Sequence, residues 1–384
     1  MVAAVRQGRS MRSVAKKFRV SLRTVQVWVG RAQGQRLDRI DWSDRPRGGR
    51  REAASTAARI EDLVVQLRKQ LKESSPLGEF GAEAIRRELE RRQVKSPPSV
   101  RTIGRILLRR GVLDGRRRVR RPPPPPGWYL PRVAARKAEL ESFDFVEGLV
   151  IRGGTDVMVF NGMSLHGGLC SSWVESSWTA KRTVRTLIAH WREHGLPAYA
   201  QFDNDTIFQG AHVWPNTFGR VIRLCLQLGV VPVFAPPRET GFQAAIESYN
   251  GRWQEKVWRR FQHDNLRTLR GHSQRYVNAA RERSAARRDA APTRKSFPED
   301  WKLNLQKPLQ GIVIFLRRTN NEGVADLLGQ SFSVDSAWPN RLVRAEVDLT
   351  RGEIRFYRLR RREPKKQPLI KTIPYLTPKK RFHE

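Results

Sequence analysis

Three acidic residues, Asp144, Asp203 and Glu247, have settings that suit metal chemistry. Asp144 lies between two phenylalanines in an apolar run, where a charge is costly unless it is paired or binds a metal. Asp203 directly follows the apolar run 198–202, and Glu247 lies in the first turns of a predicted helix. If the three converge, they would bind two Mg²⁺ or Mn²⁺ ions, because these hard cations prefer oxygen ligands. Two such ions support in-line attack on a phosphodiester.

Taken singly, each of these residues is ordinary, and an isolated glutamate on a basic helix is most often a surface residue. The order and setting of all three together favour a shared site. The helix that carries Glu247 continues with Arg252, Lys256 and Arg259. We expect these three cations to contact a phosphate backbone beside the metals.

Composition indicates a polyanionic partner. The 384 residues include 74 Lys and Arg against 37 Asp and Glu, a net charge of +37. Neutralising phosphates with such charge releases condensed counterions, so nucleic acid is the expected partner.

The only cysteines are Cys170 and Cys225, too few for a disulfide framework, and both are expected to be small buried hydrophobes.

Other classes of site and location have weaker support. No apolar run reaches the roughly 18 residues that span a bilayer, and no signal peptide is apparent, so we expect an intracellular, cytoplasmic protein associated with the nucleoid and no membrane partner. No phosphate-binding Walker loop occurs, so no nucleotide cofactor is indicated. His190 and His194 share a helix face without an HExxH motif, and we expect a surface or capping role.

The N-terminal residues 1–36 have the pattern of a helix-turn-helix, although a generic helical hairpin is the alternative. Ser21 can cap the second helix. Arg23, Thr24 and Gln26 are then exposed to a DNA groove.

Residues 53–115 repeat this theme and predict a second, winged-type helix-turn-helix. Here Arg101, Thr102 and Arg105 are expected to face DNA. Two units in tandem suit a long, specific DNA site better than one.

The rest of the chain divides by composition. Residues 116–137 form a basic and proline-rich linker. Residues 138–290 alternate strands and helices, which predicts an α/β domain with a mixed sheet. Residues 306–360 predict a small antiparallel β-barrel, and 361–384 a disordered basic tail. The first and fourth strands of the α/β domain can be neighbours, with the Glu247 helix packed across their ends.

Two sequence motifs in the α/β domain resemble those of a known family. His194-Gly-Leu-Pro197 followed by Phe202-Asp-Asn204 resembles the second-Asp motif of DDE transposases and retroviral-type integrases. Pro236-Pro and Ile246-Glu-Ser-Tyr-Asn-Gly251 resemble the third motif. With helix-turn-helix units ahead and a barrel behind, most of the chain is similar in layout to bacterial insertion-sequence transposases.

This resemblance implies a ribonuclease H-like core in which Asp144, Asp203 and Glu247 are the catalytic triad and hold two Mg²⁺ or Mn²⁺ ions. It implies an enzyme that binds the ends of its element, hydrolyses the 3′ ends and transfers them into target DNA. Double-stranded DNA and further copies of the chain, as a homo-oligomer, are the implied partners.

The chain departs from the family pattern at four positions and in one interval. Asp205 replaces a small residue, Asn161 replaces an acid, and Gln243 and Ala244 replace Asn-Gly. The 44 residues from Asp203 to Glu247 (247 − 203 = 44) are more than is usual. Two alternatives stay open: a DNA-binding regulator without catalysis, and a nuclease of the same fold that cuts without joining.

Overall fold

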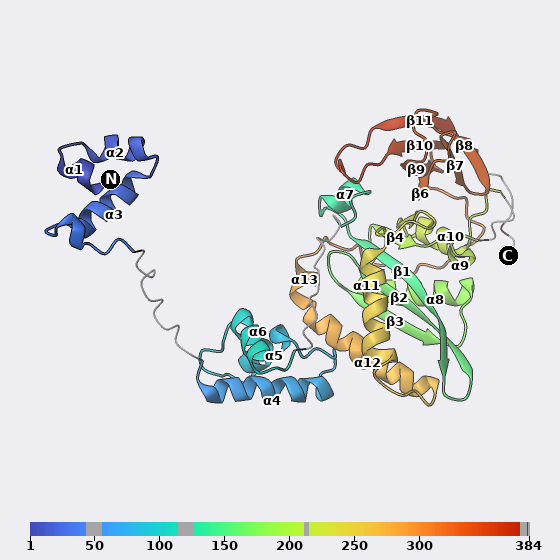
Figure 1. Ribbon diagram of the computed structural model, residues 1–384. Helices are drawn as coiled ribbons and strands as arrows, with labels where there is room; N and C mark the ends of the chain where they lie inside the picture. The colour runs from blue at the N-terminus through green and yellow to red at the C-terminus, as the bar shows by residue number, and fades with distance from the viewer. Residues whose placement is uncertain (44–55, 114–125, 211–214, 377–381, 383–384) are drawn as a thin grey trace. The chain divides into compact units, whose positions relative to one another are not determined.

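The computed structural model describes residues 1–43, 56–113, 126–210, 215–376 and 382. The chain forms two compact units, Met1–Leu63 and Val64–Glu384 (Figure 1). Residues 116–125 of the predicted proline-rich linker, and residues 377–381, 383 and 384 of the basic tail, lie outside the described residues.

The N-terminal unit contains the two helices and the turn that the sequence predicts. Its elements are α1 (Val2–Arg6), α2 (Met11–Phe18), α3 (Leu22–Ala32) and the short 3₁₀ helix η1 (Leu37–Arg39). Arg19 turns the chain in the left-handed region at φ 53°. Ser21 caps α3 by accepting a hydrogen bond from the Thr24 amide at 3.0 Å.

Three further helices follow: α4 (Ala58–Ser74), α5 (Ala82–Arg91) and α6 (Val100–Arg109). Ile85, Leu89 and Ile103 are fully buried. Arg86 donates to the Pro97 and Pro98 carbonyls at 2.8 Å and fixes the turn before α6. The described residues between 56 and 113 form no strand, so the predicted wing is wrong for this part of the chain.

A mixed sheet forms the centre of the larger unit. Its first five strands are β1 (Leu140–Ile151), β2 (Thr155–Ser164), β3 (Cys170–Glu175), β4 (Tyr199–Phe202) and β5 (Val231–Phe234). They lie in the order β3-β2-β1-β4-β5. The pairs β3–β2 and β2–β1 are antiparallel, and the pairs β1–β4 and β4–β5 are parallel. The predicted α/β core with a mixed sheet is therefore confirmed.

Helices cover both faces of these strands (Figure 1). On one face, Trp191 of α8 and Val221 of α10 pack with Phe143. On the other, Trp253 of α11 and Tyr276 of α12 pack with Val159. The helices are α8 (Ala180–His194), α9 (Thr206–Gln209), α10 (Arg220–Gln227), α11 (Ala244–Trp253), the π-helical turn η2 (Gln254–Trp258), α12 (Leu266–Arg283) and α13 (Ala285–Asp289).

The C-terminal strands extend the same sheet, which corrects the predicted separate barrel. They are β6 (Ile312–Arg318), β7 (Val324–Leu327), β8 (Gln330–Ser333), β9 (Leu342–Asp348), β10 (Glu353–Arg358) and β11 (Leu369–Pro374). β6 pairs parallel with β5, and β9, β10 and β11 continue outward, while β7 and β8 form a separate hairpin. The apolar run of β6 is buried almost throughout, so it favours a position inside a sheet.

Two segments expected to lie outside the core belong to it. The expected disordered tail contains β11, and Tyr375 just after it is only 5% exposed. The second part of the predicted linker buries Trp128 and Tyr129 and forms α7 (Pro131–Ala134). The Tyr129 hydroxyl donates to the Phe242 carbonyl at 2.8 Å.

None of the helices in the described residues is long and apolar enough to cross a membrane.

Candidate active site

The sheet aligns the two aspartates of the predicted triad. β1 and β4 pair in parallel with a constant offset, from Leu140 opposite Tyr199 (199 − 140 = 59) to Ser142 opposite Gln201. Asp144 and Asp203 have the same offset (203 − 144 = 59), so Asp203, one residue beyond β4, lies level with Asp144. Both residues are half-buried. Asp203 directly follows the carboxyl end of β4, the kind of position where open α/β sheets bind ligands, and Asp144 lies beside it within β1.

A chain of amides ties α11, which carries Glu247, to Asp144. The Asn250 side chain, one turn beyond Glu247, donates to Asp144 Oδ2 at 2.7 Å. Asn161, which is opposite Asp144 on β2, donates to Asn250 Oδ1 at 2.8 Å. Glu247 itself is exposed. These contacts fix the turn of α11 that carries Glu247 next to Asp144.

The three carboxylates interact electrostatically. Burial raises the pKa of Asp144 to about 7, and the negative charges of Asp203 and Glu247 add to the rise, against hydrogen bonds from the Phe145 amide and Asn250. The pKa of Asp203 is also raised, chiefly by burial and further by the charges of Asp205 and Glu147. A bound cation would relieve this repulsion.

The donor set fits a hard divalent cation, although it is not a finished cage. In the described part of the chain, no three Asp, Glu, His or Cys side chains lie close enough together to hold a metal as they stand. Burial is the main cause of the raised pKa of Asp144, and the charges of Asp203 and Glu247 add to it. Glu247 is exposed, so its side chain is free to change rotamer when a cation binds.

Asp205, in the loop after β4, helps to position Asp203. Asp205, a departure from the family pattern, caps α9 by accepting from the Ile207 amide at 2.7 Å. The Asp205 amide in turn donates to Asp203 Oδ1 at 3.0 Å. Asp205 therefore supports the loop as a helix cap.

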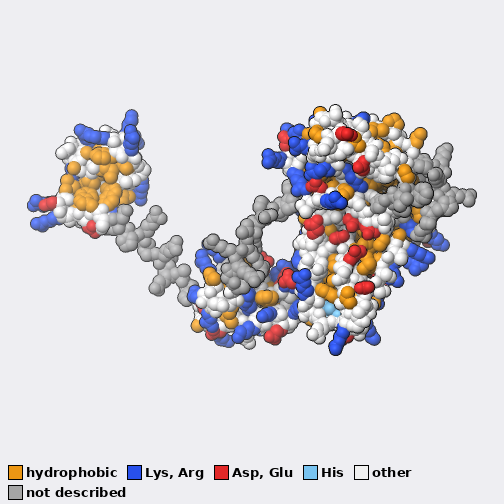
Figure 2. All heavy atoms as spheres, turned by 45° about the vertical axis from the view of Figure 1, so that its right-hand side comes forward, with side chains coloured by type: hydrophobic (Ala, Val, Ile, Leu, Met, Phe, Trp, Pro, Cys, Tyr) orange, Lys and Arg blue, Asp and Glu red, His pale blue; other side chains and the backbone are white. Residues whose placement is uncertain are grey.

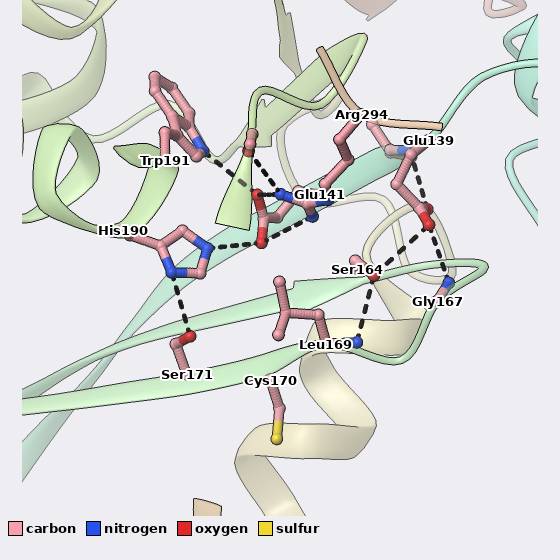
Figure 3. A network of polar contacts seen from close by, with 12 residues as sticks. Glu139, Glu141, Ser164, Gly167, Leu169, Cys170, Ser171, His190, Trp191 and Arg294 are labelled. Atoms are coloured by element: carbon pink, nitrogen blue, oxygen red, sulfur yellow. Dashed lines mark hydrogen bonds and ion pairs between the residues drawn. The ribbon is translucent and has the colours of Figure 1, made fainter. Parts of the chain in front are cut away.

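β1 carries a second buried acid whose role is structural (Figure 3). Glu141 is fully buried and contacts His190 Nε2 at 2.8 Å, Trp191 Nε1 at 3.2 Å and Arg294 Nη2 at 3.1 Å. Burial opposes its ionisation, but the charges of Arg294 and His190 outweigh burial and hold the pKa of Glu141 well below its usual range. Glu141 is thus neutralised by its own partners, whereas Asp144 is surrounded by like charges.

This network corrects the expected role of His190. The ring is 4% exposed and lies between Glu141 and Ser171, so a surface or capping role is wrong. Glu147, near Asp203, was also missed. The position of Glu147 depends on an irregularity in the β1–β2 register between Val146 and Leu149, which no local sequence pattern indicates. Cys170 and Cys225 are buried and free, as expected.

The basic residues beyond Glu247 are spread over more than one surface. Arg252 and Lys256 line a cavity of about 360 Å³ that Glu247 does not line. The Lys256 ammonium lies 3.0 Å from Glu255, and Arg259 is exposed after the π-helical turn. In the space-filling view, acidic side chains gather on one part of the larger unit, with Lys and Arg side chains around them (Figure 2).

The predicted DNA-reading residues lie at the starts of α3 and α6. Arg23 and Gln26 are exposed on α3, and Arg101 and Arg105 are exposed on α6. The two threonines are half-buried. Thr24 Oγ1 lies 2.8 Å from Ser21 Oγ and Thr102 Oγ1 lies 2.9 Å from Ser99 Oγ, so both hydroxyls belong to helix caps.

No protein-family model and no curated protein matches the sequence. The solved structures that show a distant likeness include three viral integrase structures. The catalytic core domain of BIV integrase is 14% identical over 37% of this chain and 80% of its own, with a TM-score of 0.27. A simian T-cell lymphotropic virus intasome, in complex with PP2A regulatory subunit B56 gamma, is 12% identical over 69% of this chain and 84% of its own, with a TM-score of 0.29. The HTLV-2 integrase catalytic core domain in complex with magnesium is 11% identical over 38% of this chain and 81% of its own, with a TM-score of 0.25. At these TM-scores the likeness carries no argument about activity, which therefore depends on the carboxylate geometry.

Proposed function

We propose that this protein is a DNA transposase or integrase. It would bind the ends of its element, hydrolyse their 3′ phosphodiesters and join them to target DNA. The observation that carries the proposal is the alignment of Asp144 with Asp203. The pKa of Asp144, raised chiefly by burial and further by the charges of Asp203 and Glu247, supports it. The excess of 74 basic over 37 acidic residues supports DNA as the substrate.

In this proposal each residue has a defined task. Asp144, Asp203 and Glu247 hold two divalent cations, which when bound activate the attacking hydroxyl and stabilise the leaving oxygen. Asn250 orients Asp144, and Asp205 holds the loop that carries Asp203. Arg23, Gln26, Arg101 and Arg105 contact the element ends. Joining two ends to one target requires a homo-oligomer on DNA.

A strand-transfer assay with pre-cut element ends tests this proposal. Wild-type protein with Mg²⁺ or Mn²⁺ should give joined product. Glu247→Gln should reduce joining by at least about a hundredfold, because catalysis would lose a metal ligand. The matched control is Glu255→Gln, which changes an exposed acid in the π-helical turn after α11 and should leave joining intact.

The same assay separates the competing functions. Cleaved DNA that is never joined would identify a nuclease. Binding to the ends with neither cleavage nor joining would identify a DNA-binding regulator. Either result contradicts the transposase proposal.

A further inference from the structure

We infer that Arg317, from β6 in the C-terminal part of the sheet, is a positioning residue for the loop that carries Asp203. This inference rests on the proposed function, in which Asp203 is a metal ligand. It makes the C-terminal strands an integral part of the active site.

The Arg317 side chain lies where three loops meet. Its Nη2 donates to Asn204 Oδ1 at 2.9 Å, next to Asp203. Its Nε donates to the Asp326 carbonyl of β7 at 2.9 Å, and its Nη1 lies 3.4 Å from the Ala235 carbonyl after β5. One guanidinium thus connects the loops after β4 and β5 with the β7–β8 hairpin.

Asn204 passes this restraint to the site. Its Nδ2 donates to the Ala235 carbonyl at 2.7 Å, and its Oδ1 also accepts from Gln209 Nε2 at 3.2 Å. With both ends of its amide engaged, Asn204 cannot rotate without breaking its contacts to Ala235, Gln209 and Arg317. Because Asp203 directly precedes Asn204 in the chain, these contacts also restrain the backbone of Asp203.

The cost of burying Arg317 also indicates a role beyond packing. The residue is 8% exposed, and every hydrogen bond from its guanidinium goes to a carbonyl or amide oxygen. Burial lowers its pKa to about 10, so it stays charged near neutral pH. The charge of Asp326 offsets part of this cost, but a buried cation whose hydrogen bonds all go to neutral oxygens is unfavourable for stability alone. Its planar fork, however, suits several acceptors at fixed angles.

Arg344 on β9 offers a matched control. It is 4% exposed and belongs to the same sheet, but its guanidinium contacts Glu346 at 3.0 Å and the Tyr129 carbonyl at 2.8 Å. Its contacts do not include the loop after β4. Loss of Arg344 therefore measures the structural effect of removing a buried arginine from this sheet.

The experiment titrates MnCl₂ against the full chain and follows the melting temperature in the absence of DNA. Arg317→Met should raise the Mn²⁺ concentration for half of the thermal shift by about 10–100-fold, the usual effect of losing a residue that orients a metal ligand. Arg317→Lys, which keeps the charge but loses the fork, should give a smaller rise and decides the matter if Arg317→Met does not fold. Arg344→Met should leave that concentration unchanged, whatever it does to the metal-free protein.

A double-mutant cycle adds a second readout. Because Arg317 is inferred to act through Asn204, Asn204→Ala and Arg317→Met should not be additive in their effect on the Mn²⁺ titration. Wild-type Mn²⁺ dependence in both Arg317 variants, additive effects, or no Mn²⁺ response in the wild type would overturn the positioning role. If the wild type responds to Mn²⁺ but never joins DNA, the proposed function fails while the positioning role stands.

Discussion

At the scale of single residues, the neighbours of two acids on one strand give them different chemistry. Glu141 and Asp144 are three positions apart on β1, and both are shielded from solvent. Glu141 is paired with Arg294 and His190, so its charge contributes to folding. Asp144 has the charges of Asp203 and Glu247 nearby, so its ionisation opposes folding until a cation binds.

The same acid-to-amide change should therefore have opposite effects at the two positions. The folded-state pKa of Asp144, about 7, is above its ordinary value of 3.8, so in the wild type its contribution to stability falls as pH rises through that window. Asp144→Asn should stabilise the chelator-treated protein by on the order of 1–3 kcal/mol above pH 7, with no gain below about pH 4. Glu141→Gln should destabilise it by about 3 kcal/mol at pH 7, because Arg294 is left buried without its counter-charge.

Thermal or urea unfolding of both variants from pH 4 to pH 8 measures this difference. If Asp144→Asn is as destabilising as Glu141→Gln above pH 7, the carboxylates do not repel one another and the case for a shared metal site is lost.

At the scale of elements, the sequence predicted the core well because its signals are local. The apolar runs and helical periodicities over 138–290 predict alternating strands and helices, and β1 to β5, α8, α10 and α11 lie in that range. The partners of the C-terminal strands could not be predicted in this way. Short strands with turns between them suit a barrel and a sheet extension equally, and only the pairing of β6 with β5 decides between them.

Contacts between distant parts of the chain also explain why the sequence predicted a disordered tail at 361–384 and did not predict the contact between Glu141 and His190. The Lys- and Arg-rich composition of 361–384 favoured disorder, but β11 pairs with β10 along its length. His190 and Glu141 are 49 residues apart in the chain, and no spacing rule connects them. The three acids of the proposed triad could be singled out in the sequence, because each follows or interrupts a recognisable strand or helix.

Two neighbours in sequence test whether the segment after β11 belongs to the core. Tyr375 is 5% exposed and donates to Asn216 Oδ1 at 2.7 Å, whereas Leu376 is 88% exposed. Tyr375→Ala should cost about 3 kcal/mol of unfolding free energy, and Leu376→Ala less than about 0.5 kcal/mol. If both substitutions lower the unfolding free energy by equally small amounts in denaturant unfolding, the segment after β11 does not belong to the core.

At the scale of the whole molecule, distant parts of the chain would build the proposed site. β1 and β4 align the two aspartates, α11 adds Glu247 through Asn250, and Arg317 of β6 holds the loop after β4. The site is a local concentration of negative charge in a chain of net charge +37. That contrast suits a protein that attracts DNA over its surface and places cations, at one point, between its own acids and the phosphate.

The position of bound manganese tests this account most directly. Crystals of the full chain soaked in Mn²⁺ should show anomalous scattering from two ions roughly 3.5–4 Å apart, held by Asp144, Asp203 and Glu247. In Glu247→Gln crystals at least one of the two peaks should weaken or vanish, and in Glu255→Gln crystals both should remain. Manganese bound only elsewhere, or two peaks unchanged by Glu247→Gln, would contradict the account.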